Sequence, residues 1–320
     1  MPVSTNEHRK SVLVTGASRG IGRAIALHLA ARSWDVFAGV RDREAGRALA
    51  ARCQRITPVE LDITVEAHVA RLDEVLPERV DAVVNNAGIG VGGPIQTVSL
   101  DDVRRQLEVN VVGQIAVTQG TLPRLRRSRG RLVFISSLNG RVSVPLSGVY
   151  NSSKFALEAL ADSLRVELRP WGVRVILVEP GCIDTDPWRE MMSLLDRVAA
   201  DMSPEERELY APHLAGQRAV LAKLQAQTRR PEVVAAAVER ALTRRRPPSR
   251  MIVGNDARGL VAMKAALPTP LMDAFWARGL RLPAPPRNSH GATTADFFVA
   301  DRHDGETLAM TSRSSSGSRH

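Results

Sequence analysis

The run SVLVTGASRGIG, residues 11–22, joins a short apolar stretch, a glycine-rich turn and the first residues of a helical pattern. Such a turn makes an anion site, because the free N–H groups and the dipole of a helix N-terminus both face a ligand placed there. Gly16, Gly20 and Gly22 let the backbone approach a pyrophosphate and let the helix pack closely. The run therefore predicts a nucleotide-binding turn at the start of an α/β domain.

Outward from this turn, apolar stretches alternate with helical patterns along most of the chain. The predicted strands are 11–15, 36–40, 56–60, 81–85, 131–136, 173–178 and 251–253, and the predicted helices are 21–31, 43–52, 65–76, 99–125, 150–169 and 231–242. Strands that alternate with helices favour a parallel sheet, and strands that are apolar throughout are typical of a sheet buried on both faces. The predicted fold class is α/β: a doubly wound parallel sheet of the Rossmann type with helices on both faces.

Changes in composition predict the domain boundaries. Residues 1–10 are expected to be a flexible N-terminus, and 11–282 a single domain whose strandless part, about 185–230, forms a helical substrate loop. The segment 283–320 is rich in Pro, Ser, Thr, Arg, Gly and His and is predicted to be a disordered tail. The amphipathic stretch 256–282, which Pro268 and Pro270 are expected to break, leaves three roles open: closing a pocket, joining a dimer or lying on a membrane surface.

Composition excludes several classes of protein. A chain of 320 residues that is 44% hydrophobic buries a large core, and its two distant cysteines, Cys53 and Cys182, offer neither a disulfide framework nor a zinc ribbon. The pattern predicts no secretory leader and no transmembrane segment, so the expected location is cytoplasmic, with association to a membrane surface left open. The net charge of +10 comes mostly from scattered arginines and only 4% of residues are aromatic, which favours a solvated basic surface over a nucleic-acid site.

The same glycine turn contains a rival motif. Residues 16–20 also match G-x-S-x-G, the nucleophile elbow of a serine hydrolase, with Ser18 as the nucleophile. An elbow needs earlier strands and a late histidine. Few residues precede this one, and His213, the candidate base, lies in a segment without a strand. The hydrolase is therefore the weakest of the alternatives.

A second group of residues points to acid–base chemistry. Tyr150 and Lys154 are four residues apart on a predicted helix, so they share one face, and the ammonium is expected to lower the pKa of the phenol. Ser137 follows a predicted strand thirteen residues before Tyr150. The run 85–88 (NNAG) ends another strand, where open α/β sheets bind their ligands.

Together these motifs resemble the classical short-chain dehydrogenase/reductase family. TGASRGIG (15–22) is similar to the family's cofactor motif, NNAG to its structural motif, Ser137, Tyr150 and Lys154 to its S-x12-Y-x3-K active site, and PGCIDT (180–185) to its P-G-x-I-x-T segment. The resemblance covers about residues 10–255, and Asn151-Ser152 departs from the small residues usual in the family. It implies an oxidoreductase that acts on CH–OH groups with a nicotinamide cofactor and no metal.

The resemblance also implies a role for each residue. Tyr150 would be the general acid/base, Lys154 would bind the nicotinamide ribose, Ser137 would hydrogen-bond the substrate oxygen, and Asn110 would bend its helix and hold a relay water. The implied cofactor-binding set is Gly16, Ser18, Arg19, Gly20, Ile21, Gly22, Arg41, Asp62, Asn86, Ala87, Gly88, Asn110, Tyr150, Lys154, Ile183 and Thr185. Asp62 contacts adenine or only caps a helix, Asn85 is expected to be structural, and Cys182 is expected to be a packing residue.

The end of the second predicted strand favours NADP(H) over NAD(H). An acidic residue there binds the ribose 2′-hydroxyl of NAD, but this chain has Val40 followed by Arg41. Arginine suits a 2′-phosphate because it offers paired donors, and Arg19 is a second candidate cation. Asp42 beside Arg41 weakens the argument slightly.

The substrate is predicted by analogy. The chain looks like the hydroxysteroid, retinol and 3-hydroxybutyrate dehydrogenase branch of the family, and Trp188 and Met191 follow Thr185 directly. We therefore expect a lipophilic substrate of steroid, retinoid or fatty-acyl type, with Ser137, Tyr150, Trp188 and Met191 contacting it. A homodimer or homotetramer is expected from the family, and a non-catalytic, cofactor-sensing protein is the second alternative.

Overall fold

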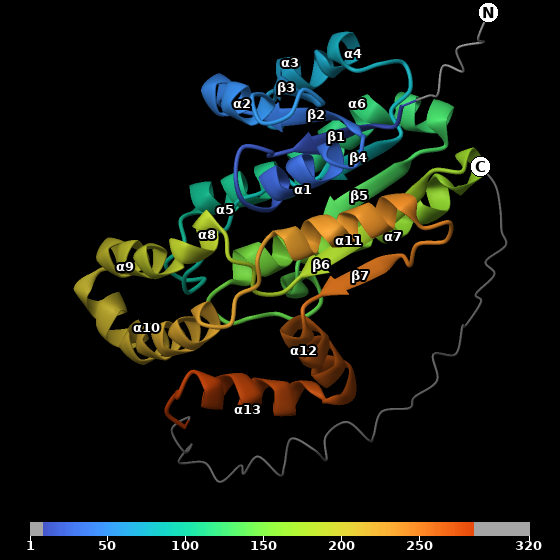
Figure 1. Ribbon diagram of the computed structural model, residues 1–320. Helices are drawn as coiled ribbons and strands as arrows, with labels where there is room; N and C mark the ends of the chain where they lie inside the picture. Colours follow the sequence, from blue (N-terminus) through green and yellow to red (C-terminus); the bar gives the residue numbers. More distant parts are fainter. Residues whose placement is uncertain (1–8, 285–320) are drawn as a thin grey trace, which may run out of the picture. The chain divides into compact units, whose positions relative to one another are not determined.

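The computed structural model describes residues 9–284 (Figure 1). The predicted flexible N-terminus and tail lie outside these residues, except for two residues of each. Seven parallel strands form one sheet in the order β3-β2-β1-β4-β5-β6-β7. The strands are β1 (Ser11–Thr15), β2 (Asp35–Val40), β3 (Ile56–Glu60), β4 (Ala82–Asn85), β5 (Arg131–Ile135), β6 (Arg174–Pro180) and β7 (Arg250–Val253). The predicted fold class is confirmed.

The strand order reverses between β1 and β4, and this switch point positions the site. Val12 pairs with Ala82 and Val14 with Val84, so both strands end at the same edge of the sheet. In open α/β sheets the crevice beyond such a switch point is the ordinary ligand site. The glycine turn follows β1 and the NNAG motif follows β4, so the two motifs meet there.

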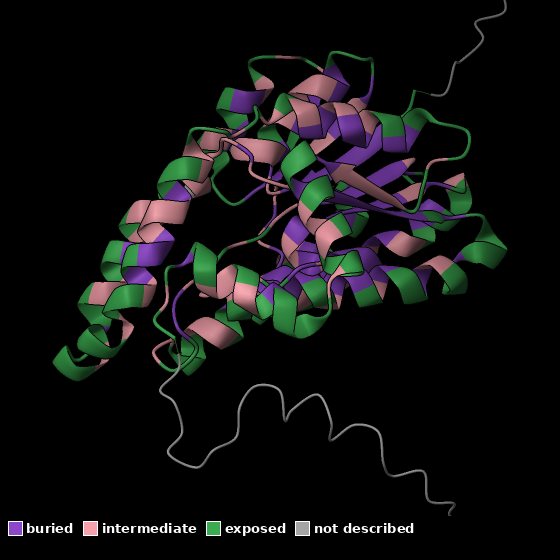
Figure 2. Cartoon of the chain, turned by 90° about the horizontal axis from the view of Figure 1, so that it is seen from below, coloured by how far each residue is buried: buried purple, intermediate pink, exposed green. Residues whose placement is uncertain are grey.

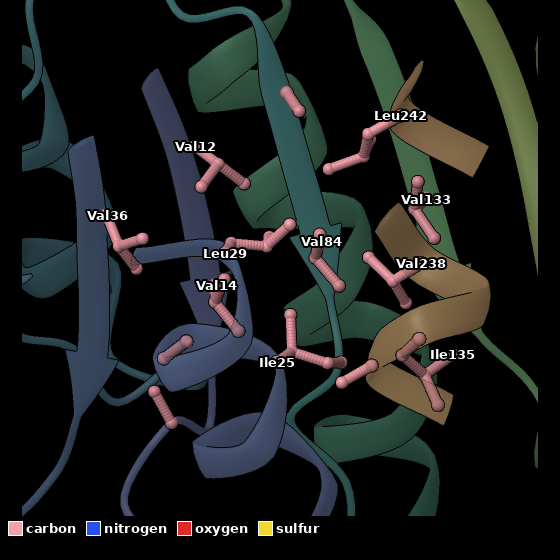
Figure 3. Packing of buried hydrophobic residues seen from close by; sticks show 14 of the residues in the cluster. Val12, Val14, Ile25, Leu29, Val36, Val84, Val133, Ile135, Val238 and Leu242 are labelled. Atoms are coloured by element: carbon pink, nitrogen blue, oxygen red, sulfur yellow. The ribbon is translucent and has the colours of Figure 1, made fainter. Parts of the chain in front are cut away.

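Helices cover both faces of the sheet, each over its own apolar core. One face carries α1 (Gly20–Ala30), α2 (Arg43–Ala50) and α11 (Glu232–Thr243). Figure 3 shows how the helix side chains Ile25, Leu29 and Val238 pack against the strand side chains Val14, Val84 and Ile135. The other face carries α3 (Glu66–Ala70), α4 (Leu72–Val75), α6 (Gly113–Ser128) and α7 (Gly148–Glu167). Burying one such leucine or isoleucine contributes about 1.5–3 kcal/mol. Buried residues accordingly concentrate in the strands (Figure 2).

Two helix predictions were wrong in detail. The predicted helix 65–76 is two short helices, α3 and α4, with Arg71 as the cap between them. Pro270 does not break the stretch 256–282: it lies in the first turn of α13 (Thr269–Gly279), where its missing N–H has no intrahelical partner to lose. The break lies between α12 (Asn255–Ala266) and Pro268, which caps α13. Pro231 likewise precedes α11 as its N-cap.

The predicted substrate loop is helical. It consists of α8 (Asp186–Arg189), α9 (Met191–Asp201) and α10 (Pro204–Gln225), which share an apolar cluster separate from the two cores of the sheet. The two ends of this segment touch, because Ile183 and Arg229 form an isolated parallel bridge. The N–H of Asp184 donates to the Arg229 carbonyl at 2.8 Å.

Helices α12 and α13 pack beside the end of β5. Ala257 and Met272 share a small apolar cluster with Leu138 and Val142, which follow that strand. Leu271 and Phe275 on α13 are exposed. Within residues 9–284, no helix has the length and apolar character needed to cross a bilayer.

Candidate active site

The glycine turn is shaped for a close backbone approach. Gly16 has a φ of +65°, and a Cβ there would lie 2.9 Å from the Cα of Ala87. A Cβ on Gly22 would lie 2.2 Å from the carbonyl oxygen of Gly16. Helix α1 begins directly after the turn, its N-cap Arg19 makes no capping bond, and its first turn has no acidic residue. These free N–H groups fit the pyrophosphate of a dinucleotide.

Asn86 and Thr15 hold this turn against the end of β4. Asn86 Nδ2 donates to the carbonyls of Thr15 and Gly16 at 2.9 and 3.2 Å. The N–H groups of Asn86 and Ala87 both donate to Thr15 Oγ1, at 2.9 and 3.0 Å. Asn86 thus braces the turn, and Thr15, which was outside the predicted set, is its partner. Asn85 is structural as expected, since its side chain donates to Thr118 Oγ1 at 3.0 Å.

Asn110 lies in a widened helical turn. Helix α5 (Leu100–Leu107) passes into a π-helical turn, η1 (Glu108–Val112), before α6 begins. Asn110 is fully buried, its Oδ1 accepts the N–H of Ile89 at 2.8 Å, and its Nδ2 donates to the Ile89 carbonyl at 3.0 Å and to Ser153 Oγ at 3.1 Å. It therefore joins the loop after β4 to α7.

Gln106, one turn before Asn110, was not predicted. Its Oε1 accepts the N–H of Val91 at 2.6 Å, and its Nε2 donates to the carbonyl of Ile89 at 2.9 Å. A Cβ built on Gly90, between these residues, would lie 3.9 Å from Tyr150 Cδ2. Gln106 thus holds the loop that faces the tyrosine.

The predicted acid–base residues lie together at the end of β5. Tyr150 is hydrogen-bonded to Ser137, and Lys154 Nζ lies 5.7 Å from the centre of the tyrosine ring. The Lys154 ammonium donates to the Ile135 carbonyl at 2.9 Å. Burial lowers the pKa of Lys154 to about 8, and the nearby Glu158 carboxylate acts in the opposite direction.

One electrostatic prediction was wrong. Burial raises the pKa of the Tyr150 phenol above its ordinary value, and the hydrogen bond to Ser137 offsets this only in part. Lys154 makes no contribution of its own to this shift. Its ammonium donates to Ile135 and lies beside the ring, while removal of the phenol from water dominates.

Asp62 and Arg41 lie at the ends of β3 and β2. Asp62 Oδ1 accepts the N–H and hydroxyl of Thr64 at 3.0 and 2.7 Å. Partial burial raises the pKa of Asp62, but the Thr64 bonds and the charges of Arg41 and His68 together lower it below its ordinary value. Arg41 is exposed and has no hydrogen-bonded partner among residues 9–284, whereas Arg43 donates to Glu60 at 2.8 Å.

The segment after β6 reaches the glycine turn. A Cβ on Gly20 would lie 3.3 Å from Thr185 Cγ2, so Thr185 and the start of α1 are adjacent, and Ile183 is buried. Arg19 faces Glu190 at 3.9 Å. Cys182 is half-buried, and burial, reinforced by Asp256, raises the pKa of its thiol to about 12. That pKa suits a packing residue rather than a nucleophile.

Helix α9 of the helical segment 185–230 contacts the loop that follows β4. A Cβ on Gly92 would lie 3.7 Å from Leu194 Cδ2, and one on Gly93 would lie 3.1 Å from Val198 Cγ1. Trp188 and Met191 are half-buried and pack in the cluster shared by α8, α9 and α10. Leu194 and Val198, which the substrate prediction did not include, are the side chains that touch the loop after β4.

Two remaining sequence features have structural roles. His213, the candidate base of a hydrolase, lies in α10 with its ring 5.3 Å from that of Tyr210. Asn151, the departure from the family pattern, is buried, accepts from Asn139 Nδ2 at 2.7 Å and donates to the Val144 carbonyl at 2.8 Å. It joins α7 to the loop after β5.

Comparison with known proteins agrees with this geometry. Residues 10–194 match the short chain dehydrogenase family. The chain is 32% identical to mouse estradiol 17-beta-dehydrogenase 2 over 299 residues, which is 87% of this chain and 77% of the relative. It is 34% identical to rat retinol dehydrogenase 16 over 278 residues, covering 83% and 87% of the two chains.

A solved structure matches the fold as well. A short chain dehydrogenase from Burkholderia cenocepacia, crystallised in complex with NADP, superposes with a TM-score of 0.67 at 26% identity over 84% of this chain and 97% of its own. The sequence motifs, the parallel sheet and these relatives lead to one assignment. The chain belongs to the short-chain dehydrogenase family of oxidoreductases.

Proposed function

We propose that the protein is an NADP(H)-dependent oxidoreductase that interconverts a lipophilic secondary alcohol and its ketone, or an alcohol and its aldehyde. The observation that carries this proposal is the hydrogen-bonded pair Tyr150 and Ser137, with Lys154 beside the ring, at the carboxyl edge of the sheet. A nicotinamide cofactor, when bound there, supplies the hydride acceptor or donor. The protein's own side chains then have to transfer one proton and stabilise the charge that develops on the substrate oxygen.

Tyr150 is the group that moves the proton. In the direction of reduction, its hydroxyl gives a proton to the carbonyl oxygen, and the raised pKa keeps it protonated until the transfer. The Ser137 hydroxyl donates to the same oxygen and stabilises the charge that develops on it. The Lys154 ammonium would bind the ribose hydroxyls of the cofactor. Thr185, which is adjacent to Gly20, and Ile183 would hold the nicotinamide amide.

Replacement of Tyr150 by Phe tests this assignment. The substitution removes the exchangeable proton and keeps the ring, so turnover in an NADPH-oxidation assay with a panel of ketones and aldehydes should fall by about 10²–10⁴. Ser152→Ala is the matched control, because Ser152 is exposed on the same helix and bonds only within it. Near-normal turnover in the Phe variant would exclude the mechanism. Cofactor binding without turnover of any carbonyl compound would favour the cofactor-sensing alternative.

The preference for NADP(H) rests on Arg41. It lies at the end of β2, it is exposed, and its charge already acts on Asp62, whereas Arg43 is held by Glu60. Arg41→Ala should weaken NADPH binding selectively, and Val40→Asp should shift the preference toward NADH by placing a carboxylate against the 2′-phosphate. Fluorescence titration with both cofactors measures this. Equal curves for NADPH and NADH in the unmodified protein would refute the preference.

The lipophilic substrate is supported by the relatives' names and by the apolar segment. The two relatives are named for estradiol and retinol, both apolar alcohols. In this chain Trp188 and Met191 belong to the apolar cluster of α8, α9 and α10. Leu194 on α9 contacts the loop after β4, and the same loop faces Tyr150. Trp188→Ala and Met191→Ala should raise KM for bulky apolar ketones in a homologous series. The exposed Leu209→Ala should not, and equally efficient turnover of short polar ketones would exclude the lipophilic pocket.

A further inference from the structure

A buried group of charged side chains lies one helical turn along α7 from Lys154, and the proposed reaction does not use it. Glu158, one helical turn beyond Lys154 on α7, is 6% exposed. Its Oε1 accepts the Ser136 hydroxyl at 2.6 Å, and its Oε2 accepts Arg250 Nε at 2.9 Å. A carboxylate this deeply buried is held only where hydrogen bonds and opposite charges compensate for the lost water.

The contacts follow a regular order. Three successive residues at the end of β5 each bind one residue of α7: the Ile135 carbonyl accepts from Lys154, the Ser136 hydroxyl donates to Glu158, and Ser137 is hydrogen-bonded to Tyr150. Glu158 therefore belongs to the same strand-to-helix junction as the two reacting side chains. A shift of its anchor would also move the residues on either side of Ser136.

The other charges around Glu158 come from α7 itself, β6, β7 and the loop after β5. Arg250 on β7 also donates to Asp162 at 2.7 Å and lies 3.4 Å from Glu179 on β6, and Arg141 lies 3.4 Å from Glu179. Burial, followed by the charge of Glu158, raises the pKa of Glu179 to about 7. Glu179 is therefore largely protonated below neutral pH. Glu158 is the carboxylate whose charge acts on Lys154.

We propose that Glu158 is a positioning residue for the reaction: fixed by Ser136 and Arg250 one helical turn beyond Lys154, its carboxylate is the buried opposite charge that keeps the Lys154 side chain in place as a donor at the Ile135 carbonyl. The inference rests on the proposed function, since the charged ammonium donates stronger hydrogen bonds to ribose hydroxyls than the neutral amine does. Burial alone drives Lys154 toward the neutral amine, which has no charge and donates weaker hydrogen bonds. Glu158 is the opposite charge on the same helix that counteracts this.

Titration of the lysine side chains tests the proposal without cofactor or substrate. The chain has four lysines, Lys10, Lys154, Lys223 and Lys264, so lysine labelled with ¹³C and ¹⁵N gives few NMR signals, and a Lys154→Arg variant assigns the one of interest. Glu158→Gln should lower the midpoint of Lys154 by about one pH unit, while Glu158→Asp should restore most of it. Asp162→Asn is the matched control: it loses an Arg250 contact at the exposed end of the cluster and should leave Lys154 unchanged.

Activity provides the second measurement. In Glu158→Gln, the pH above which NADPH affinity falls should move down by the same interval as the Lys154 midpoint. An unshifted midpoint in a folded variant overturns the proposal. If Glu158→Gln does not fold, Ser136→Ala loosens the same anchor, and a downward shift of the midpoint supports the proposal while an unchanged midpoint overturns it. Because the lysine titration needs no turnover, it is informative even if no carbonyl compound is reduced.

Discussion

At the scale of single residues, the buried amide of Gln106 has the clearest measurable role. It satisfies the N–H of Val91 and the carbonyl of Ile89 in the loop that faces Tyr150. Gln106→Leu leaves both groups without this partner, so the free energy of unfolding in urea should fall by about 1–3 kcal/mol. Gln96→Leu is the control, because Gln96 accepts a hydrogen bond from Tyr210 at an exposed position and should change stability by less than about 0.5 kcal/mol. Equal effects of the two substitutions would show that the loop does not depend on Gln106.

Glu179 predicts how stability changes with pH. Its pKa is raised in the folded protein, so between its ordinary value of 4.5 and about 7 the folded chain binds more protons than the unfolded chain. Stability that this group contributes is therefore fully present below pH 4.5 and is lost as the pH rises through 7. Glu179→Gln should flatten the fall in Tm between pH 5 and pH 8, as measured by calorimetry. The exposed Glu208→Gln should not, and parallel curves for wild type and Glu179→Gln would contradict the prediction.

At the scale of the elements, two helices predict opposite responses to the same substitution. In α1, a Cβ on Gly22 would lie 2.2 Å from the Gly16 carbonyl and 2.5 Å from Asn86 Nδ2. Gly22→Ala should therefore displace the turn and reduce NADPH affinity at least tenfold, as measured by fluorescence titration. In α12, a Cβ on Gly259 meets nothing within 4 Å, so Gly259→Ala should stabilise the chain by about 0.5–1 kcal/mol. Unchanged affinity in Gly22→Ala would mean that the turn tolerates side chains.

The elements also show which parts of this structure are readable from sequence. The glycine turn, the order of the strands along the chain and the Tyr150–Lys154 spacing are local patterns, and they predicted the parallel sheet and a shared helix for Tyr150 and Lys154. Gln106 and Glu158 are different, because their partners lie 15 or more residues away and no local pattern distinguishes them from solvated side chains. The pKa of Tyr150 was predicted with the wrong sign for the same reason. Spacing reveals a neighbouring charge, but burial depends on the whole packing around the residue.

At the scale of the whole molecule, we propose a homodimer or homotetramer. Helix α7 packs against both α5 and η1, and these helices expose the apolar side chains Leu107, Val112 and Phe155. Light scattering should give two or four times the chain mass of 34.8 kDa. Phe155→Glu should reduce that mass, whereas Leu209→Glu on α10, also at an exposed leucine, should not. A monomer mass for the unmodified protein would exclude the proposal.

The touching ends of the helical segment have a consequence for how such chains diverge. The N–H of Asp184 donates to the Arg229 carbonyl, so the chain between them starts and ends at one point, between the end of β6 and the start of α11. Doubling the length of a closed loop costs only about 0.6 kcal/mol, so this insert can grow, shrink or be replaced without disturbing the strands beneath it. Grafting the corresponding insert from a relative, joined at these two positions, should transfer substrate preference as a unit. The sheet and the catalytic tyrosine would remain those of the recipient.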